Sequence, residues 1–191
     1  FNTRLEQGAI GIASLGYAVP GTVIAVGVLI PIAWLDNQID FLSRIWFDYP
    51  TGLLLSGTLG ILVFAYLVRF LSISLNTVDS GLISIKPNLD ESARSLGASP
   101  SKVLRRIHLP ILRTSLLTAL LLVFVEVLKE LPTTLILRPF NFNTLAVRTY
   151  ELASDERLMD AALPALAIVI IGLLPVLLIT KSILKERLTN D

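Results

Sequence analysis

The chain has 191 residues, of which 53% are apolar and only 16% are charged, and its mean hydropathy is +0.73. A soluble domain of this length carries about 25% charged residues, so the composition indicates a membrane protein. The net charge of +1 gives no reason to expect a nucleic-acid partner, and the lack of cysteine excludes disulfides and thiolate metal sites.

The remaining residue types give little support to a metal site or a catalytic site. The chain has one histidine, His108, and one methionine, so soft or imidazole ligation of a metal is not expected. The first residue is Phe1, and no cationic region with a cleavage site follows it. We therefore expect a fragment or a processed piece, which further helices could precede.

Apolar runs along the chain predict four membrane-spanning helices, because a hydrocarbon core of about 30 Å takes about 20 helical residues to cross. Three runs without charge cover residues 8–35, 51–68 and 161–180. A fourth run, 111–131, carries Arg113 near its start and three charges near its end. We predict a single transmembrane domain over residues 1–191, with spans at about 20–35, 51–71, 111–131 and 161–180.

The first apolar run is interrupted by Pro20, which cannot donate a backbone hydrogen bond and disfavours helix in the residue before it. We expect a short interfacial or re-entrant helix near residues 5–19, followed by the spanning helix at 20–35. A single kinked and tilted helix is the alternative. The long connection between residues 131 and 160 should contain structure of its own, and the stretch 144–153 predicts a short helix there.

Basic residues near the ends of the spans predict which side of the membrane each connection faces. Residues 72–112 contain five Lys and Arg, and the C-terminal tail adds three, whereas residues 36–50 contain one Arg and three Asp. We therefore expect the connection at 72–110 and the C-terminus in the cytoplasm. Trp34, Trp46 and Tyr49 would then form an aromatic belt at the outer surface. Arg69 would extend to the cytoplasmic interface.

The segment from 90 to 110 reads as two short helices that meet at a glycine. Asn88 followed three residues later by Glu91 resembles a capping box, and Gly97 is a typical left-handed helix stop. Ser99 and Pro100 then fit the N-cap and the first position of a second helix.

Each of these short helices has an apolar face. The first face comprises Leu89, Ala93 and Leu96, and the second comprises Val103, Leu104 and Ile107. The basic residues remain for solvent, lipid headgroups or acidic groups of a partner: Arg94, Lys102, Arg105 and Arg106. Any inner-membrane protein needs a basic loop for its orientation, but that need explains neither Gly97 nor Glu91.

The spacing within this segment also follows a known pattern. Glu91, Ala93, Gly97, Ile107, Leu109 and Pro110 match E-A-A-x3-G-x9-I-x-L-P, with Ser92 in place of the first alanine. The pattern resembles the cytoplasmic EAA loop of permease subunits in bacterial ABC importers. The resemblance implies an all-α fold, a polytopic transmembrane helical bundle of the type I ABC importer permease kind, which crosses the bacterial inner membrane several times. It also implies that the loop couples to an ATPase through Asp90, Glu91, Ser92, Ala93, Leu96, Gly97, Ala98, Ile107, Leu109 and Pro110.

A permease of this kind would work with several partners. The resemblance implies a cytoplasmic ABC ATPase dimer, a second permease half that is fused or separate, and a periplasmic substrate-binding protein, all in contact with the lipid bilayer. The chain has no G-x4-G-K-[ST] sequence to hold nucleotide phosphates. We therefore expect no bound cofactor and no enzyme activity in this chain, and hydrolysis of ATP by a partner subunit.

Three charges lie towards the end of the run at 111–131: Glu126, Lys129 and Glu130. The helical rise places Glu126 about 24 Å along a helix that starts at Pro110, in the outer part of the hydrocarbon core. Charges there are costly and tend to face a cavity, so all three are candidates for a translocation path. Extension of Lys129 and Glu130 to the outer interface is the alternative.

The segment 129–153 resembles the corresponding part of iron(III)-type ABC permeases, and residues 15–22 and 65–71 show the same likeness. The likeness implies the C-terminal half of a fused two-half permease, with iron(III) as the substrate. Ferric ion prefers oxygen ligands, which Glu126 and Glu130 could offer. Arg138 and Arg148 would equally suit an anion or a contact with the binding protein. Thiamine, a polyamine or another small solute is the alternative substrate.

Two other classes of protein compete with the transporter. A membrane hydrolase would need a nucleophile and a base inside the apolar helices, but the only histidine is at the cytoplasmic boundary and the four predicted spans contain no aspartate. A membrane scaffold without transport activity is the other alternative. Loss of ATP-driven uptake on changing Gly97 to Asp or Pro, with insertion retained, would separate a transporter from both.

Overall fold

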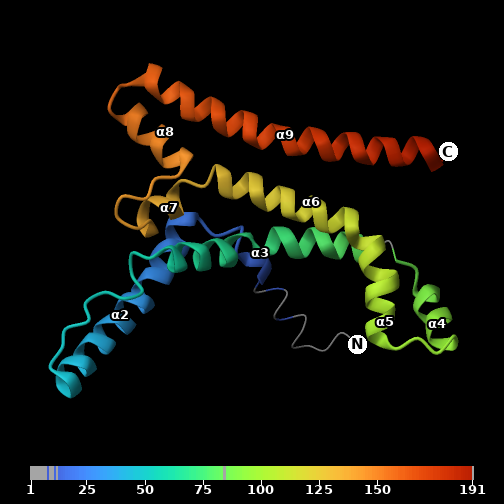
Figure 1. The fold of residues 1–191 in the computed structure, drawn as a ribbon, viewed down its shortest axis with the longest axis horizontal. Coiled ribbons are helices and arrows are strands. Elements are labelled where there is room, and N and C mark those ends of the chain that lie inside the picture. The colour runs from blue at the N-terminus through green and yellow to red at the C-terminus, as the bar shows by residue number, and fades with distance from the viewer. Residues whose placement is uncertain (1–7, 9–10, 12, 84, 191) are drawn as a thin grey trace.

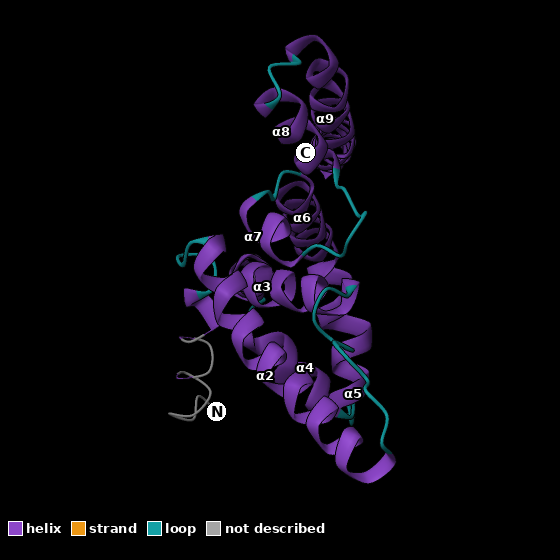
Figure 2. Cartoon of the chain, turned by 90° about the vertical axis from the view of Figure 1, so that its left-hand side faces the viewer, coloured by secondary structure: helices purple, strands orange, loops and turns teal. Residues whose placement is uncertain are grey.

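A computed structural model describes residues 8, 11, 13–83 and 85–190 of the chain. These described residues form helices joined by turns and loops, without a strand (Figures 1 and 2), which confirms the predicted all-α class. The helical elements are α2 (Gly21–Phe47), α3 (Leu59–Ile83), α4 (Pro87–Ser95), α5 (Pro100–Val103), the π-helical turn η1 (Leu104–His108), α6 (Leu109–Leu128), α7 (Pro132–Leu137), α8 (Leu145–Ser154) and α9 (Leu158–Asn190).

Four helical segments of the described chain are long and apolar enough to cross a membrane. They are Gly21–Phe47, Leu59–Ile83, Pro100–Leu128 and Leu158–Leu177, and they follow the order of the four predicted spans. Between 6% and 28% of the apolar part of each segment is buried within the chain. Most of this apolar surface is therefore left for lipid or for other protein.

The helices extend beyond the spans that the apolar runs predicted. α2 begins at Gly21, next to the expected start, but continues past residue 35 to Phe47. α3 begins at Leu59, later than expected, and continues past residue 71 to Ile83. A run of uncharged residues marks the part of a helix that suits hydrocarbon, whereas the ends of a helix depend on caps and turns.

The segment before α2 supports the two-part interpretation of the first apolar run. Residues 13–15 are helical and 16–18 form a turn, while Pro20 occupies the N-cap position of α2. The helix is therefore interrupted before Pro20, and the first apolar run does not form one kinked helix. Residues 5–7, 9, 10 and 12 of the expected first helix lie outside the described part of the chain.

Two aspartates explain why α2 continues past its apolar part. Asp36 is fully buried, and its carboxylate accepts three successive backbone N–H groups, at residues 54–56, over 2.7 to 3.2 Å. Asp40 accepts the N–H of Gly52 at 2.9 Å. The predicted outer loop at 36–50 is therefore mostly helix, and the chain after it returns along α2 to reach α3 (Figure 1).

The aromatic residues expected at the outer surface lie on or just after α2. Trp34, Trp46 and Tyr49 are 59%, 75% and 66% exposed. Their exposure is compatible with an aromatic belt at a membrane surface, where such rings have an apolar and a wet side. The side of the membrane that they face stays a prediction.

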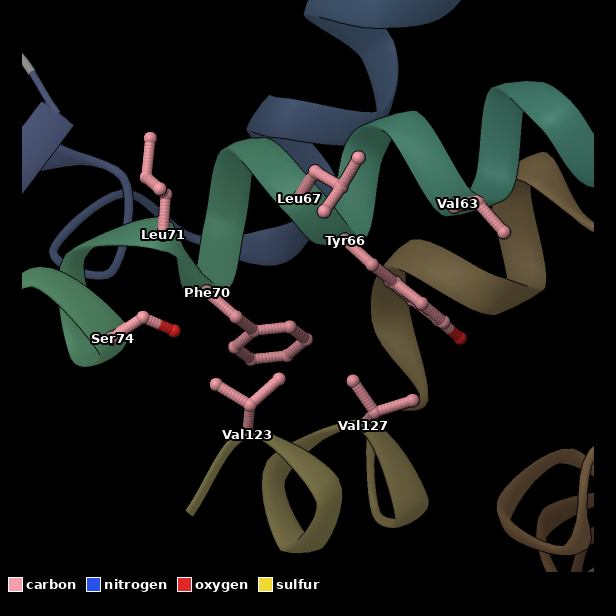
Figure 3. Close-up of a pocket in the computed structure, with 8 residues that line it drawn as sticks. All are labelled: Val63, Tyr66, Leu67, Phe70, Leu71, Ser74, Val123 and Val127. Atoms are coloured by element: carbon pink, nitrogen blue, oxygen red, sulfur yellow. The ribbon is translucent and has the colours of Figure 1, made fainter. Parts of the chain in front are cut away.

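The packed centre of the chain joins α2, α3 and α7. Its buried side chains are Ile24, Ala25, Ile61, Leu62, Ala65 and Leu137. From there α3 packs along α6, where Phe70 faces Val123 and Val127 (Figure 3). A Cβ on Gly81 would come within 3.0 Å of Ser115, so the two helices need a small residue at this crossing. α8 packs on α9 (Figure 1).

Candidate functional site

The predicted coupling loop folds as α4, a glycine turn and α5. Gly97 has a φ of +75°, and the turn has both hydrogen bonds of a Schellman motif, from the Gly97 N–H to Arg94 O at 2.9 Å and from the Ala98 N–H to Ala93 O at 3.0 Å. The predicted helix stop at Gly97 is confirmed. A Cβ on Gly97 would meet no atom within 4 Å, so only the backbone conformation demands glycine here.

The two helix starts in this loop differ in how well the sequence predicted them. α4 begins at Pro87 with Lys86 in the N-cap position and no side-chain cap, so the predicted capping box of Asn88 and Glu91 is wrong. A proline at the first helical position has a suitable φ and no N–H to satisfy, which moves the start ahead of Asn88. α5 does begin after Ser99, the predicted N-cap, although this side chain makes no cap hydrogen bond.

α5 continues through η1 into α6 as one helical segment, Pro100–Leu128. In η1 the N–H of Leu109 bonds to Leu104 O. Pro110, the next residue, has no N–H, and its ring crowds the carbonyl four residues earlier, which the wider turn accommodates. The sequence predicted a short helix and a separate span, whereas the structure joins them at a bend (Figure 1). α5 and α6 are therefore joined without an intervening loop.

A side-chain contact ties α4 to this continuous segment. His108 Nε2 lies 2.7 Å from Asp90 Oδ1, so α4 is attached to η1 as well as to α5. Ala93 is buried, as its predicted apolar face requires, but Leu96 on the same predicted face is 88% exposed. Of the other predicted coupling residues, the exposed ones are Glu91, Ser92, Leu109 and Pro110, and the partly buried ones are Ala98 and Ile107.

The second predicted apolar face divides in the same way. Val103 is buried, whereas Leu104 is 51% exposed. The π-helical turn begins at Leu104, and its wider winding shifts the residues that follow away from the positions of a regular helix. Leu96 and Leu104 are therefore available to a partner rather than to the chain's own core.

The three charges at the end of α6 divide into two separate contacts. Lys129 Nζ lies 2.8 Å from Glu126 Oε1, and these side chains are 56% and 21% exposed. Glu130 is 6% exposed and pairs instead with Arg69 of α3, with 3.2 Å between Oε2 and Nε. The predicted extension of Arg69 to a membrane interface is therefore wrong, because a buried acid lies within its reach. A place for the three residues on a translocation path stays a prediction.

Arg69 and Glu130 form the centre of a buried polar cluster. Arg69 Nη1 donates to Val19 O at 3.2 Å, while its Nε faces Glu130 without the alignment of a hydrogen bond. Glu130 Oε1 accepts from the Thr133 N–H at 3.2 Å and from the Thr133 hydroxyl at 2.6 Å. The same hydroxyl lies 3.2 Å from Gly21 O. The cluster therefore links α2, α3 and α7 with the end of α6.

Gly21 is required by the tightness of this cluster. A Cβ on Gly21 would lie 2.6 to 2.8 Å from three polar side-chain atoms of the cluster. Thr134 adds a further link, because its hydroxyl donates to Glu130 O at 2.8 Å and contacts the hydroxyl of Tyr66. The described atoms around Gly21 therefore leave no room for a side chain at this position.

The three segments that carried the likeness to iron(III)-type permeases meet here. Residues 15–22 supply two carbonyl oxygens, residues 65–71 supply Arg69, and the start of 129–153 supplies Glu130. The ion pair between these segments was not predicted from the sequence. The signal that could have found it is the presence of opposite charges in two different apolar runs, where an unpaired charge is costly.

The connection after α7 contains the two arginines that could suit an anion. The predicted short helix is confirmed as α8, and Thr144 is its N-cap, accepting a backbone N–H at 3.3 Å. Arg138 Nη1 lies 3.0 Å from Glu151 Oε1, and Arg148 Nη1 lies 3.6 Å from Oε2 of the same carboxylate. Glu151 therefore balances part of both positive charges. Within the described chain, no group of three histidine, aspartate or glutamate residues is placed to hold a metal ion.

Known proteins with similar sequences are membrane permeases. The chain is 28% identical over 165 residues to the Fe(3+)-transport system permease protein FbpB 2 of Haemophilus influenzae, an alignment that covers 86% of this chain and 29% of the relative. It is 32% identical over 171 residues to the putative 2-aminoethylphosphonate transport system permease protein PhnV of Salmonella typhimurium, which covers 90% of this chain and 58% of that relative.

These alignments show that the chain spans less than two thirds of either relative, 29% of one and 58% of the other. The family model described as the binding-protein-dependent transport system inner membrane component matches residues 1–186, nearly the whole chain. The match confirms the predicted family and the predicted location in the inner membrane. With four helices that suit a membrane and a match of this extent, the chain belongs to the family of inner membrane components of binding-protein-dependent transport systems.

Proposed function

We propose that this chain is part of the membrane-spanning subunit of an ATP-driven importer, and that it transmits motion from a cytoplasmic ATPase to the spanning helices. The observation that carries the proposal is the segment Pro100–Leu128, which joins the exposed glycine turn to a helix long enough to cross a membrane. Membership of the family supports the same activity. The partner would bind and hydrolyse ATP, and this chain would bind no cofactor.

The coupling surface in this proposal consists of α4 and the turn at Gly97. Leu96 is 88% exposed beside the turn and offers an apolar contact to a groove on the ATPase. The contact of Asp90 with His108, at 2.7 Å, attaches α4 to η1. A displacement of α4 is therefore passed to α6, and from α6 to α3, which packs along it. Movement of these helices between two arrangements would open the solute path first to one side of the membrane and then to the other.

The proposal also includes a second permease half and a periplasmic substrate-binding protein. The four spanning segments leave most of their apolar surface exposed in the single chain, which accommodates a second half as well as lipid. α8 and α4 lie at opposite ends of the molecule (Figure 1). A binding protein that delivers solute on the periplasmic side would meet this end of the molecule.

Recovery of the ATPase with the solubilised whole transporter tests the coupling surface. Leu96→Asp should lower the recovered ATPase about tenfold, because a charge replaces an apolar contact at the centre of the surface. Phe140→Asp is the matched control, since Phe140 is 94% exposed and lies just before α8, away from α4. This variant should keep the ATPase. Equal recovery of the ATPase with both variants would refute the proposed coupling surface.

We propose iron(III) as the transported solute. The likeness to FbpB 2, an Fe(3+)-transport permease, extends over 86% of this chain, and the partly exposed carboxylate of Glu126 could offer oxygen to a passing ferric ion. A second candidate is 2-aminoethylphosphonate, because PhnV is identical at 32% of the aligned positions, against 28% for FbpB 2.

Uptake into cells that depend on this transporter decides between the solutes. Cells expressing the whole system should accumulate radiolabelled iron(III) and should not accumulate 2-aminoethylphosphonate or thiamine. A transporter without its ATPase serves as the control for passive entry. Accumulation of the phosphonate alone would replace iron(III) by the second candidate.

A further inference from the structure

We propose that Arg69 and Glu130 are positioning residues that hold α7 between α2 and α3 and do not contact the transported solute. The proposal rests on the proposed transport function only for its uptake measurement. The placement of α7 itself is a property of this chain and can be measured without transport.

Most of the Glu130 carboxylate is occupied by contacts with other described residues. Its Oε1 accepts both donors of Thr133, at 3.2 and 2.6 Å, and its Oε2 faces Arg69 at 3.2 Å. Gly21 closes the remaining side, since even a Cβ there would lie 2.7 Å from Oε1. Glu126 differs, because it is 21% exposed and pairs with the exposed Lys129. The carboxylate of Glu130 is therefore committed to the protein itself.

Arg69 lies in the middle part of α3, far from both ends of the helix. The helical rise places it about 15 Å from Leu59 and about 21 Å from Ile83, the two ends of α3. In hydrocarbon a charge at this depth is stable only when it is paired. Removing one member of a buried pair is strongly destabilising, whereas replacing both charges together is often tolerated. The pair should therefore act as a unit, and the loss of one member should release the elements that it joins.

α7 is the element that these charges hold. Thr133 and Thr134 are fully buried, and Leu137 is 2% exposed in the core shared with α2 and α3. The chain passes from α6 through Leu131 into α7 and then on to α8 (Figure 1). Release of α7 would change how α6 meets the pair of α8 and α9. A transporter that alternates between two arrangements needs this junction to be fixed.

A double-mutant cycle in the whole transporter tests whether the two charges act only on each other. Arg69→Gln and Glu130→Gln should each lower uptake about tenfold or more, whereas the double variant should return to within about threefold of the unmodified protein. Arg44→Gln removes the ion pair of a largely exposed arginine with Asp40, at 2.7 Å, and should leave uptake unchanged. A double variant as inactive as the single variants would overturn the proposal, because one of the charges would then act on the solute directly.

Cysteine labelling measures the placement of α7 and does not require transport. This chain has no cysteine of its own, so a single introduced cysteine is its only labelled position. Leu137→Cys should be protected from a maleimide in the unmodified background, be labelled about tenfold faster or more together with Glu130→Gln, and be protected again in the double variant. Val147→Cys, at a fully buried position of α8, should stay protected in every background.

The outcomes of the labelling separate the possible failures. Unchanged protection of Leu137→Cys in the single variants would overturn the proposal, and so would labelling of Val147→Cys together with it, which would indicate a general loss of folding. An unmodified transporter that takes up none of the tested solutes would count against the proposed function alone. The labelling result would still decide the role of the pair.

Discussion

Replacing Gly97 with valine should uncouple α4 from the membrane helices at a modest cost in stability. At a φ of +75° a β-branched residue is strained, and the left-handed conformation costs an L-residue roughly 1–2 kcal/mol. A Cβ on Gly97 would meet no atom within 4 Å, so the cost comes from the backbone and not from a clash. Unwinding the Schellman turn relieves this strain and changes the angle between α4 and α5. If the unwound arrangement is favoured by the same amount, its relative population rises about 5- to 30-fold.

Gly57 provides a matched control, because it lies just before the start of α3, at the end of this helix that is far from the coupling loop. Its φ is +74°, and a Cβ there would also meet no atom within 4 Å. Gly57→Val should therefore lower the free energy of unfolding by a similar amount, roughly 1–2 kcal/mol, without touching the coupling loop. Thermal unfolding of the purified variants compares their stability. ATP-driven uptake in proteoliposomes, at equal amounts of inserted protein, compares their coupling.

The expected result is a similar fall in Tm for both variants and a loss of uptake for Gly97→Val alone. If Gly57→Val lost as much uptake, the loss would come from stability and the reasoning about coupling would be refuted. Full uptake by Gly97→Val, with its Tm lowered, would refute it as well, because the strained turn would then have no part in transmission.

Three further variants test other contacts. Gly21→Ala should lower the free energy of unfolding by about 1–3 kcal/mol, because the new methyl group overlaps three polar atoms. Gly27→Ala is the control: its methyl group meets no atom within 4 Å, so this variant should raise the free energy of unfolding by about 0.5–1 kcal/mol. Equal thermal shifts of the two variants in detergent would contradict the packing at Gly21. Asp36→Ala leaves three backbone N–H groups without their acceptor and should cost about 3 kcal/mol or more, which would show as faster proteolysis of the connection at 48–58. His108→Ala removes the contact with Asp90. This variant should lower the free energy of unfolding by less than about 1 kcal/mol and should reduce ATP-driven uptake. Unchanged uptake would argue against this contact as a link between α4 and η1.

Local signals in the sequence predicted the parts of the fold that depend on neighbouring residues. The four apolar runs identified four helices that suit a membrane, because the thickness of hydrocarbon sets the length of such a run. Gly97 was recognisable as a helix stop, because a left-handed residue is a property of one position. The loop pattern from Glu91 to Pro110 was recognisable because its spacing is linear in the chain, and the family match agrees with it.

Most features that the sequence did not predict depend on distant residues. The continuation of α2 past residue 35 was not predicted, because Asp36, an acid that interrupts the apolar run, is buried by a segment that returns from residues 54–56. The joining of α5 to α6 was not predicted, because a π-helical turn carries the helix through Pro110. Arg69 was assigned to an interface because nothing near it in the sequence offers an opposite charge. For Asp36 and Arg69 the deciding contact comes from a distant part of the chain, whereas the π-helical turn is formed by residues close to Pro110.

The sequence by itself determined that this chain has four segments suited to a membrane, turns at Gly97 and carries the loop pattern of a permease. Each of these follows from composition or from the order of nearby residues. Only the tertiary structure decided that Glu130 pairs with Arg69 rather than joining Glu126 and Lys129, and that α7 is held by this pair. A buried charge is stable where folding brings an opposite charge within about 3–4 Å, and no local pattern specifies which distant residue will supply it.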